Sequence, residues 1–254
     1  MDLGLTGTVC LIVGAGSGIA RETALLLGRE GVQVAAADRD EAKAAATAAA
    51  IRDAGGKAAP LALDVTDPRS VAAAVAAVEA QLGPVDGLVN CAGIYQVRKV
   101  EAIGDDDWAQ MLRIHAEGTF RTCRAVLPGM LARRRGAIVN TTSLHALRGQ
   151  ADAAHYAAAK GAILAFTKSL AREKAADGIR ANMVAPGPID TPLWRGTMTA
   201  EEIEQARRAR SRIIPMGRLG EAREIAPAIA FLLSPLASYI TGTVIGIDGG
   251  ERMD

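Results

Sequence analysis

The segment TVCLIVGAGSGIA, residues 8–20, decides the fold of this chain. Its apolar first half predicts a short buried strand at residues 8–13, and a helical pattern follows the glycines to about residue 30. Glycines between a strand and a helix let the backbone turn tightly, and they present free N–H groups and a helix N-terminus to a phosphate. A simple strand-to-helix connection would show the same pattern. The phosphate-binding interpretation assigns dinucleotide contacts to Gly14, Ser17, Gly18 and Ile19.

The next predicted strand, residues 33–37, ends at an acidic residue, Asp38, twenty residues after Gly18. A carboxylate at this point accepts hydrogen bonds from the adenosine ribose hydroxyls and repels a 2′-phosphate, which favours NAD over NADP. Arg39 follows directly and is the residue that would bind such a phosphate. We interpret Arg39 as packing on adenine or facing solvent, so NAD is the expected cofactor and NADP the alternative.

Strand and helix patterns alternate through the rest of the chain. Further strands are predicted at residues 58–63, 87–89, 136–142, 180–184 and 244–247. Further helices are predicted at residues 41–54, 67–82, 105–131, 155–176 and 221–233. This alternation predicts a Rossmann-like α/β fold: a doubly wound parallel sheet of about seven strands with helices on both faces. Because no repeat or low-complexity linker interrupts the chain, we expect one domain over residues 1–254.

Composition limits the possible partners and the cellular environment. Half of the 254 residues are hydrophobic but only 3% are aromatic, so small aliphatic residues must build the core. The net charge of +1 argues against nucleic acid or an anionic membrane as a partner. The three cysteines, Cys10, Cys91 and Cys123, indicate neither a disulfide framework nor a zinc site, and no metal is expected. The first apolar run is too short for a signal or a membrane span, so a cytoplasmic protein is expected.

A tyrosine and a lysine four residues apart, Tyr156 and Lys160, lie in a predicted helix, and Ser143 stands thirteen residues before the tyrosine. Positions i and i+4 share one helix face, so the ammonium group would lie beside the phenol. A neighbouring cation lowers the pKa of a phenol, which can then exchange a proton with an alcohol oxygen. Taken alone, such a pair is usually part of an ordinary amphipathic helix.

Taken together, the motifs resemble the short-chain dehydrogenase/reductase family over almost the whole chain. The resemblance is carried in order by the glycine turn, NCAG at residues 90–93, Ser143, Tyr156-x-x-x-Lys160, PGPIDT at residues 186–191 and DGG at residues 248–250. It implies hydride transfer between a nicotinamide dinucleotide and a carbonyl or alcohol. It also implies that Tyr156 is the general acid or base, that Lys160 lowers its pKa and binds the nicotinamide ribose, and that Ser143 holds the substrate oxygen.

The resemblance implies further cofactor contacts. Adenine would meet Asp64 and Val65, the ribose would border Asn90, and the nicotinamide carboxamide would bind Ile189 and Thr191. Pro186 and Gly187 belong to the same cofactor-binding segment.

Four positions depart from the family pattern: Val13 for a threonine, Ala20 for a glycine, Cys91 for an asparagine, and His115 for an asparagine that supports a water-linked proton path to the lysine. His115 would keep that relay or give it a pH dependence, because imidazole titrates near about 6.5; the alternative is a histidine that only packs between helices. We expect His115→Ala to slow turnover without weakening NADH binding. Among the other histidines, His145 is expected to line the substrate pocket and His155 to point away from Tyr156.

Substrate identity is expected to depend on residues 94–97, residues 144–152 and a lid at residues 191–216. The preferred function is NAD-dependent oxidation of a secondary alcohol or sugar-derived polyol. An NADPH-dependent 3-oxoacyl-type ketone reductase is the alternative, although Asp38 argues against its usual cofactor. A catalytically silent dinucleotide-binding scaffold or sensor is the alternative from another class. The resemblance also implies a homotetramer in which the helices at residues 105–131 and 155–176 pair across a two-fold axis.

Overall fold

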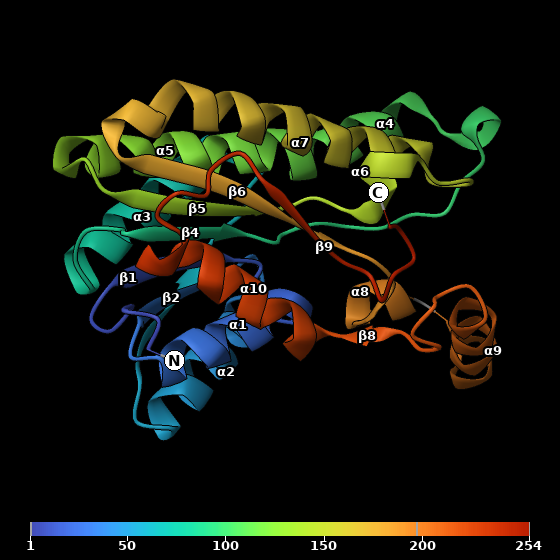
Figure 1. Ribbon diagram of the computed structural model, residues 1–254, viewed down its shortest axis with the longest axis horizontal. Coiled ribbons are helices and arrows are strands. Elements are labelled where there is room, and N and C mark those ends of the chain that lie inside the picture. Colours follow the sequence, from blue (N-terminus) through green and yellow to red (C-terminus); the bar gives the residue numbers. More distant parts are fainter. Residues whose placement is uncertain (1, 197, 254) are drawn as a thin grey trace.

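A computed structural model describes residues 2–196 and 198–253. Within these residues, seven parallel strands form the central sheet (Figure 1). Their spatial order is β3 (Lys57–Ala62), β2 (Gln33–Asp38), β1 (Val9–Val13), β4 (Gly87–Asn90), β5 (Gly136–Thr141), β6 (Ile179–Pro186) and β9 (Val244–Ile247). The strand order reverses between β1 and β4, which opens a ligand-binding crevice beyond the carboxyl ends of the strands. The predicted doubly wound α/β fold is confirmed.

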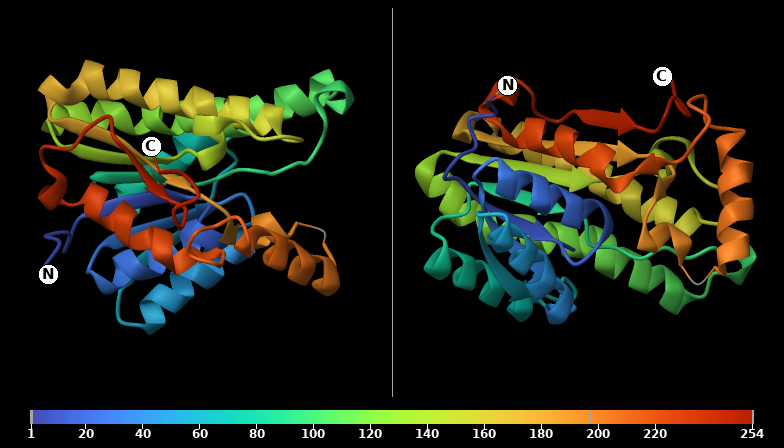
Figure 2. Two further views of the ribbon diagram at one scale, coloured as in Figure 1. Left: turned by 45° about the vertical axis from the view of Figure 1, so that its right-hand side comes forward. Right: turned by 90° about the horizontal axis from the view of Figure 1, so that it is seen from below.

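Helices cover both faces of the sheet (Figures 1 and 2). One face carries α1 (Gly18–Arg29), α2 (Glu41–Asp53) and α10 (Ala222–Leu233). The other face carries α3 (Pro68–Gln81), α5 (Gly118–Arg133) and α7 (Ala154–Lys174). Side chains of a strand alternate between the faces, so Cys10 and Ile12 of β1 belong to one hydrophobic core and Leu11 to the other. As the composition predicted, Ala, Val, Leu and Ile dominate both cores.

The single helix predicted at residues 105–131 is interrupted. It consists of α4 (Asp105–Leu112), a π-helical turn η2 (Arg113–Glu117) and α5. A π turn adds one residue to the helical ladder, and here it accompanies a buried His115. The apolar spacing on either side continues a helical period, so the sequence pattern predicted an unbroken helix.

Smaller elements gather beyond the carboxyl end of the sheet (Figure 1). They are α6 (Leu144–Arg148), α8 (Pro192–Arg195), α9 (Ala200–Ser211) and the paired strands β7 (Ile189–Asp190) and β8 (Gly220–Glu221). Short 3₁₀ turns η1 (Val100–Ala102), η3 (Ala175–Asp177) and η4 (Pro235–Ala237) lie in connections. The region expected to form a lid contains α8 and α9, apart from Thr197, which lies outside the described residues.

The helix α9 contacts the rest of the protein mainly through charge. No residue of this helix, as described, is buried. Asp190 of β7 accepts hydrogen bonds from Arg195 and Arg207, which joins α8 and α9 to the small sheet. None of the described helices is both long and apolar enough to cross a bilayer.

Candidate active site

The glycine turn meets two other motifs at the carboxyl edge of the sheet. Gly14 has φ +88°, and a Cβ added there would lie 2.9 Å from the backbone N of Ala92, so only glycine allows this close approach. Gly18, with φ +54°, lies with its Cβ position 3.5 Å from the side chain of Thr191. The turn therefore lies against both the NCAG segment and the start of the lid.

The PGPIDT and DGG segments also meet at the carboxyl edge of the sheet. The backbone N–H of Gly187 donates to the carbonyl of Ile247 over 3.0 Å, and a Cβ at Gly187 would lie 2.6 Å from that of Asp248. Thr191 caps α8 by accepting a hydrogen bond from the backbone N–H of Trp194. The PGPIDT and DGG segments thus form one wall of the crevice.

Asp38 is fixed beside the glycine turn. Its Oδ2 accepts a hydrogen bond of 2.9 Å from the N–H of Gly16, and its Oδ1 accepts one of 3.0 Å from the N–H of Asp40. The side chain of Ser17 does not cap α1, so the first N–H groups of that helix face the crevice without a side-chain acceptor. The carboxylate fits the hydroxyls of the adenosine ribose, and the helix N-terminus fits the pyrophosphate of a dinucleotide. Arg39 is exposed.

Asp64 and Val65 follow the neighbouring strand β3. The Oδ1 of Asp64 accepts hydrogen bonds from the N–H and the hydroxyl of Thr66, both at 2.8 Å, and these bonds hold the pKa of the carboxyl below its usual range. Val65 is buried against Gly118, and its carbonyl accepts a hydrogen bond from Arg121. Both residues follow β3, which pairs with β2, and their contact with adenine stays a prediction.

Ser143, Tyr156 and Lys160 come together, as predicted. Ser143 follows β5 and caps α6, while Tyr156 and Lys160 lie one turn apart on α7. Tyr156 is 9% exposed and Lys160 is 4% exposed. The ammonium of Lys160 donates a 2.7 Å hydrogen bond to the carbonyl of Thr141 and lies 5.7 Å from the centroid of the Tyr156 ring.

Burial dominates the protonation of this group. It raises the pKa of Tyr156 to about 12, although a hydrogen bond from Ser143 acts in the opposite direction. Burial also lowers the pKa of Lys160 to about 8. This corrects the expectation that Lys160 brings the pKa of the phenol below its ordinary value. Among the groups of the chain, burial outweighs the influences that lower this pKa. At neutral pH the phenol keeps its proton and the ammonium is mostly charged, an arrangement suited to donating a proton to a carbonyl oxygen.

Three rings surround Tyr156 edge-on. The centroids of Tyr95, His115 and His145 lie 5.0, 5.4 and 5.8 Å from that of Tyr156. His145 therefore contacts the Tyr156 ring, and its place in a substrate pocket stays a prediction. His155 faces Gln96 instead, with its Nε2 3.3 Å from the amide oxygen. Tyr95 lies in the segment expected to contact substrate, but nothing in the sequence singled it out from its neighbours.

His115 is 1% exposed and reaches the same site. Its Nε2 lies 2.9 Å from the carbonyl oxygen and 3.1 Å from the nitrogen of Ile94, whereas its Nδ1 is buried without a partner among the described residues. Its ring fills the space next to Gly93, where a Cβ would lie 2.2 Å from Cε1. Burial, aided by Lys160, lowers the pKa of His115 to about 3. The imidazole is thus neutral at physiological pH, which corrects the expectation of a titration near 6.5.

The side chain of Asn90 belongs to a buried network. It donates 2.9 Å to the amide oxygen of Asn140 and accepts from the hydroxyl of Thr122, while Asn140 donates to Thr167. These bonds join β4 and β5 to α5 and α7. Any contact of Asn90 with a cofactor ribose is therefore left to its backbone. The neighbouring Cys91 lies 2.9 Å from the hydroxyl of Thr141.

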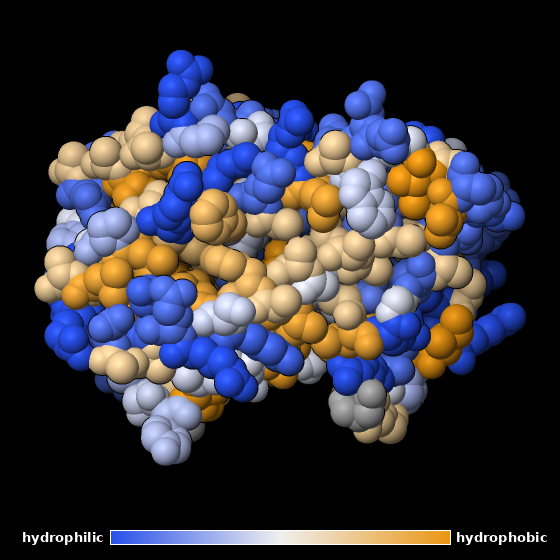
Figure 3. Space-filling model, turned by 90° about the horizontal axis from the view of Figure 1, so that it is seen from above, coloured by the Kyte–Doolittle hydropathy of each residue, from blue (hydrophilic) through white to orange (hydrophobic). Residues whose placement is uncertain are grey.

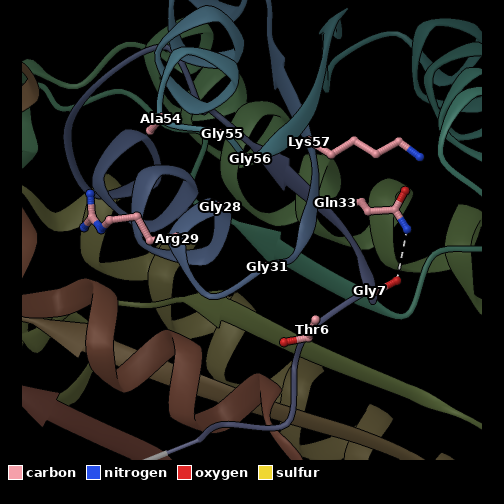
Figure 4. Close-up of a pocket in the computed structure, with 10 residues that line it drawn as sticks. All are labelled: Thr6, Gly7, Gly28, Arg29, Gly31, Gln33, Ala54, Gly55, Gly56 and Lys57. Atoms are coloured by element: carbon pink, nitrogen blue, oxygen red, sulfur yellow. Dashed lines mark hydrogen bonds between the residues drawn. The ribbon is translucent and has the colours of Figure 1, made fainter.

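A separate depression of about 590 Å³ lies at the opposite, amino end of the strands (Figure 4). Glycines form much of its wall, and Arg29 and Lys57 point away from each other. Parallel sheets bind ligands at the other end, so this depression is not assigned to the active site. Within the described ranges, no cluster of three or more His, Cys, Asp or Glu side chains could hold a metal ion.

Comparison with known proteins agrees with the fold and the crevice. Residues 14–251 match the protein family described as enoyl-(acyl carrier protein) reductase. The chain is 39% identical to the 3-oxoacyl-(acyl-carrier-protein) reductase FabG of Thermotoga maritima over 246 residues, 97% of this chain and 98% of that protein. It is 42% identical to a protein of Xanthobacter autotrophicus named inactive 2-(S)-hydroxypropyl-CoM dehydrogenase 2, over 87% of this chain and 96% of that protein. A short-chain type dehydrogenase/reductase from Mycobacterium marinum superposes with a TM-score of 0.92 at 32% identity, covering 100% of this chain and 98% of that chain.

The chain belongs to the short-chain dehydrogenase/reductase family. It is an oxidoreductase of the class that acts on CH–OH or keto groups with a nicotinamide dinucleotide. The similarity to FabG proteins supports the alternative prediction, a 3-oxoacyl-type reductase, better than the preferred prediction of a polyol dehydrogenase.

Proposed function

We propose that this protein interconverts a 3-oxo group and the corresponding secondary alcohol with NAD(H). The observation that carries the proposal is the placement of Ser143, Tyr156 and Lys160 at the carboxyl edge of the sheet, with Lys160 held by the carbonyl of Thr141. The names of the FabG relatives support a 3-oxo substrate. No comparable observation favours a sugar-derived polyol.

In the reducing direction, a dinucleotide held by the glycine turn and the PGPIDT segment would supply a hydride to the carbonyl carbon. Tyr156 donates its phenolic proton to the carbonyl oxygen as the C–H bond forms, and Ser143 donates a hydrogen bond to that same oxygen. Lys160 stabilises the resulting phenolate, and Thr141 fixes the ammonium in place. Hydride and proton together convert the ketone to an alcohol. Oxidation runs through the same groups in reverse, with Tyr156 as the base.

The cofactor preference rests on Asp38. Its carboxylate lies where a 2′-phosphate would bring a second negative charge, and its bond to Gly16 holds it there. The proposed contacts of the remaining cofactor atoms are Gly14, Ser17, Gly18 and Ile19 for the pyrophosphate, Asp64 and Val65 for adenine, the backbone of Asn90 for ribose, and Pro186, Gly187, Ile189 and Thr191 for nicotinamide. We propose that residues 1–254 form one functional domain, with a lid at residues 191–216.

The substrate class is tested by following NADH oxidation by the purified protein with ethyl 3-oxobutanoate, and NAD reduction with a panel of polyols. Turnover of the 3-oxo compound with little polyol oxidation is the expected result. Efficient polyol oxidation without turnover of the 3-oxo compound would reverse the proposal. Tight NADH binding without any turnover would favour a silent dinucleotide sensor.

A homotetramer is proposed through the outer face of α4, α5 and α7. The rings of Trp108 and Phe120 are 43% and 42% exposed, and Phe120 stacks edge-on with Phe166 at 5.9 Å. Figure 3 shows apolar residues between charged ones on this face. Sedimentation at four times the monomer mass of 26.3 kDa is expected. Phe120→Glu should dissociate this interface, and an unchanged mass would contradict its assignment.

A further inference from the structure

Two arginines from different parts of the chain share one buried carboxylate beside the substrate pocket. Arg148 ends α6, Arg210 lies on α9, and Glu251 follows β9. An Nη of Arg148 donates 2.5 Å to Oε1 of Glu251, and an Nη of Arg210 lies 3.9 Å from the same oxygen. The Glu251 side chain is 1% exposed, whereas the two arginine side chains are 34% and 28% exposed.

The cluster carries an excess of positive charge. Two guanidinium groups face one carboxylate, so one positive charge is not neutralised within the trio. At 3.9 Å, Arg210 is too far from Glu251 for a hydrogen bond. Oε2 of Glu251 is buried and has no partner among the described residues. The trio is therefore an incompletely satisfied polar site, and its partly exposed members are the two cations.

The cluster adjoins the reacting groups. Arg148 comes five residues after Ser143, so the helical rise separates their backbones by about 7.5 Å along the axis of α6. Arg148 and Arg210 both add to the burial that lowers the pKa of His145 to about 4. Burial raises the pKa of Tyr95. The positive charge of Arg210 lowers this pKa, and the negative charge of Asp152 raises it. His145 and Tyr95 both contact the Tyr156 ring, and Arg148 lies three residues after His145 on α6, so the cluster lies on the side of the site that these rings occupy.

We propose that Arg148 and Arg210 form an anion subsite, so that the substrate is a short oxo or hydroxy compound with a terminal carboxylate or a similar anionic group. Glu251 holds the two guanidinium groups in position and leaves one charge for the substrate. This inference rests on the proposed function and narrows it to short oxo acids, because Arg148 ends the five-residue helix that Ser143 caps. An acyl chain on a neutral thioester offers no charge at this distance.

The test compares 3-oxobutanoate with its uncharged ethyl ester as substrates of the full chain with NADH. The wild type should show a kcat/KM for the anion at least about tenfold above that for the ester, the usual size of a charge-assisted contact. Arg210→Gln and Arg148→Gln should each reduce this ratio by about tenfold or more. A purely structural latch would instead lower kcat/KM equally for both compounds.

The control is Arg208→Gln, which removes a charge from the same helix at a 75% exposed side chain that pairs with Glu204. It should leave the ratio unchanged. A wild type that prefers the ester, or an Arg210→Gln ratio equal to that of the wild type, would overturn the subsite.

A wild type that turns over neither compound would contradict the proposed function, and binding then tests the subsite separately. Titration of the protein–NADH complex with 3-oxobutanoate, followed by NADH fluorescence, should saturate for the wild type and weaken about tenfold or more for Arg210→Gln. No saturable binding to the wild type would overturn the subsite.

Discussion

The backbone N–H of Gly16 donates a 2.9 Å hydrogen bond to Oδ2 of Asp38, which ties the acidic end of β2 to the glycine turn. A Cβ at Gly16 would lie 2.8 Å from that oxygen, so the contact requires both residues as they are. This relationship fixes a negative charge beside the glycine turn, and the proposed preference for NAD rests on it.

Asp38→Ala should shift the ratio of NADPH to NADH affinity toward NADPH by about tenfold to a hundredfold, because it removes the ribose acceptor and the repulsion of the 2′-phosphate. Parallel fluorescence titrations with both cofactors measure the ratio. Arg39→Ala is the matched control, and it should leave a preference for NADH in place. A wild type that prefers NADPH and loses that preference in Arg39→Ala would make Arg39 the phosphate ligand.

Lys160 should make stability rise with pH in the alkaline range. Its pKa is lowered from 10.5 to about 8, so between pH 8 and 10 the unfolded chain binds more protons at this site than the folded chain. The free energy of unfolding then increases with pH across that window, by about 2 kcal/mol for this group. Tyr156, whose pKa is raised, contributes with the opposite sign above about pH 10.

Urea denaturation of the wild type and Lys160→Met at pH 8 and pH 10 measures that contribution. Between pH 8 and pH 10 the free energy of unfolding should increase less in Lys160→Met than in the wild type, by about 2 kcal/mol. Lys168→Met, an exposed lysine on the same helix, should keep the wild-type increase. Equal increases in wild type and Lys160→Met would show that burial does not perturb Lys160.

His115→Ala should slow turnover while NADH affinity stays unchanged, because the imidazole lies 2.9 Å from the carbonyl of Ile94 and stacks edge-on with the Tyr156 ring, and it makes no hydrogen bond to the glycine turn among the described residues. His115→Asn, which keeps a donor and an acceptor, should recover part of the rate. Since the pKa of His115 is about 3, the pH–rate profile should show no inflection from this group near pH 6.5. Unchanged turnover in His115→Ala would reduce His115 to a packing residue.

Asp190→Asn should loosen the segment that we propose as a lid, residues 191–216. Asp190 binds Arg195 and Arg207, and the arginines hold its pKa below the usual range. Losing these ion pairs should raise KM several-fold with a smaller effect on kcat, and wild-type KM should itself rise with salt as screening weakens them. Glu201→Gln, an exposed residue of α9 that accepts a hydrogen bond from Gln205, is the control. A KM that changes neither with salt concentration nor in Asp190→Asn would contradict the assignment of α9 to a lid.

The fold was predictable because its signals are local. Each apolar run followed by a helical period predicts one strand and one helix, and their alternation leaves a parallel sheet as the simplest solution. The pairing of Tyr156 with Lys160 follows from helical spacing alone. The π turn at His115 gives no such signal, because the apolar period continues on both sides of it.

The features that the sequence did not reveal depend on residues brought together from distant segments. The raised pKa of Tyr156 reflects burial beneath rings from Tyr95 and His145, and no local pattern reports that burial. The pairing of Arg148 with Glu251 spans 103 positions. Asn90 was expected to border the cofactor, but its side chain is satisfied by Asn140, whose position beside it follows only from strand pairing.

The most direct test of the central claim is single-turnover oxidation of bound NADH by ethyl 3-oxobutanoate in the wild type and in Tyr156→Phe. Removal of the phenolic proton should abolish measurable NADH oxidation, a loss of at least about a hundredfold, while the affinity for NADH stays within about twofold of the wild type. Equal rates in the two proteins would contradict the assignment of Tyr156 as the proton donor, and with it the catalytic account of this site.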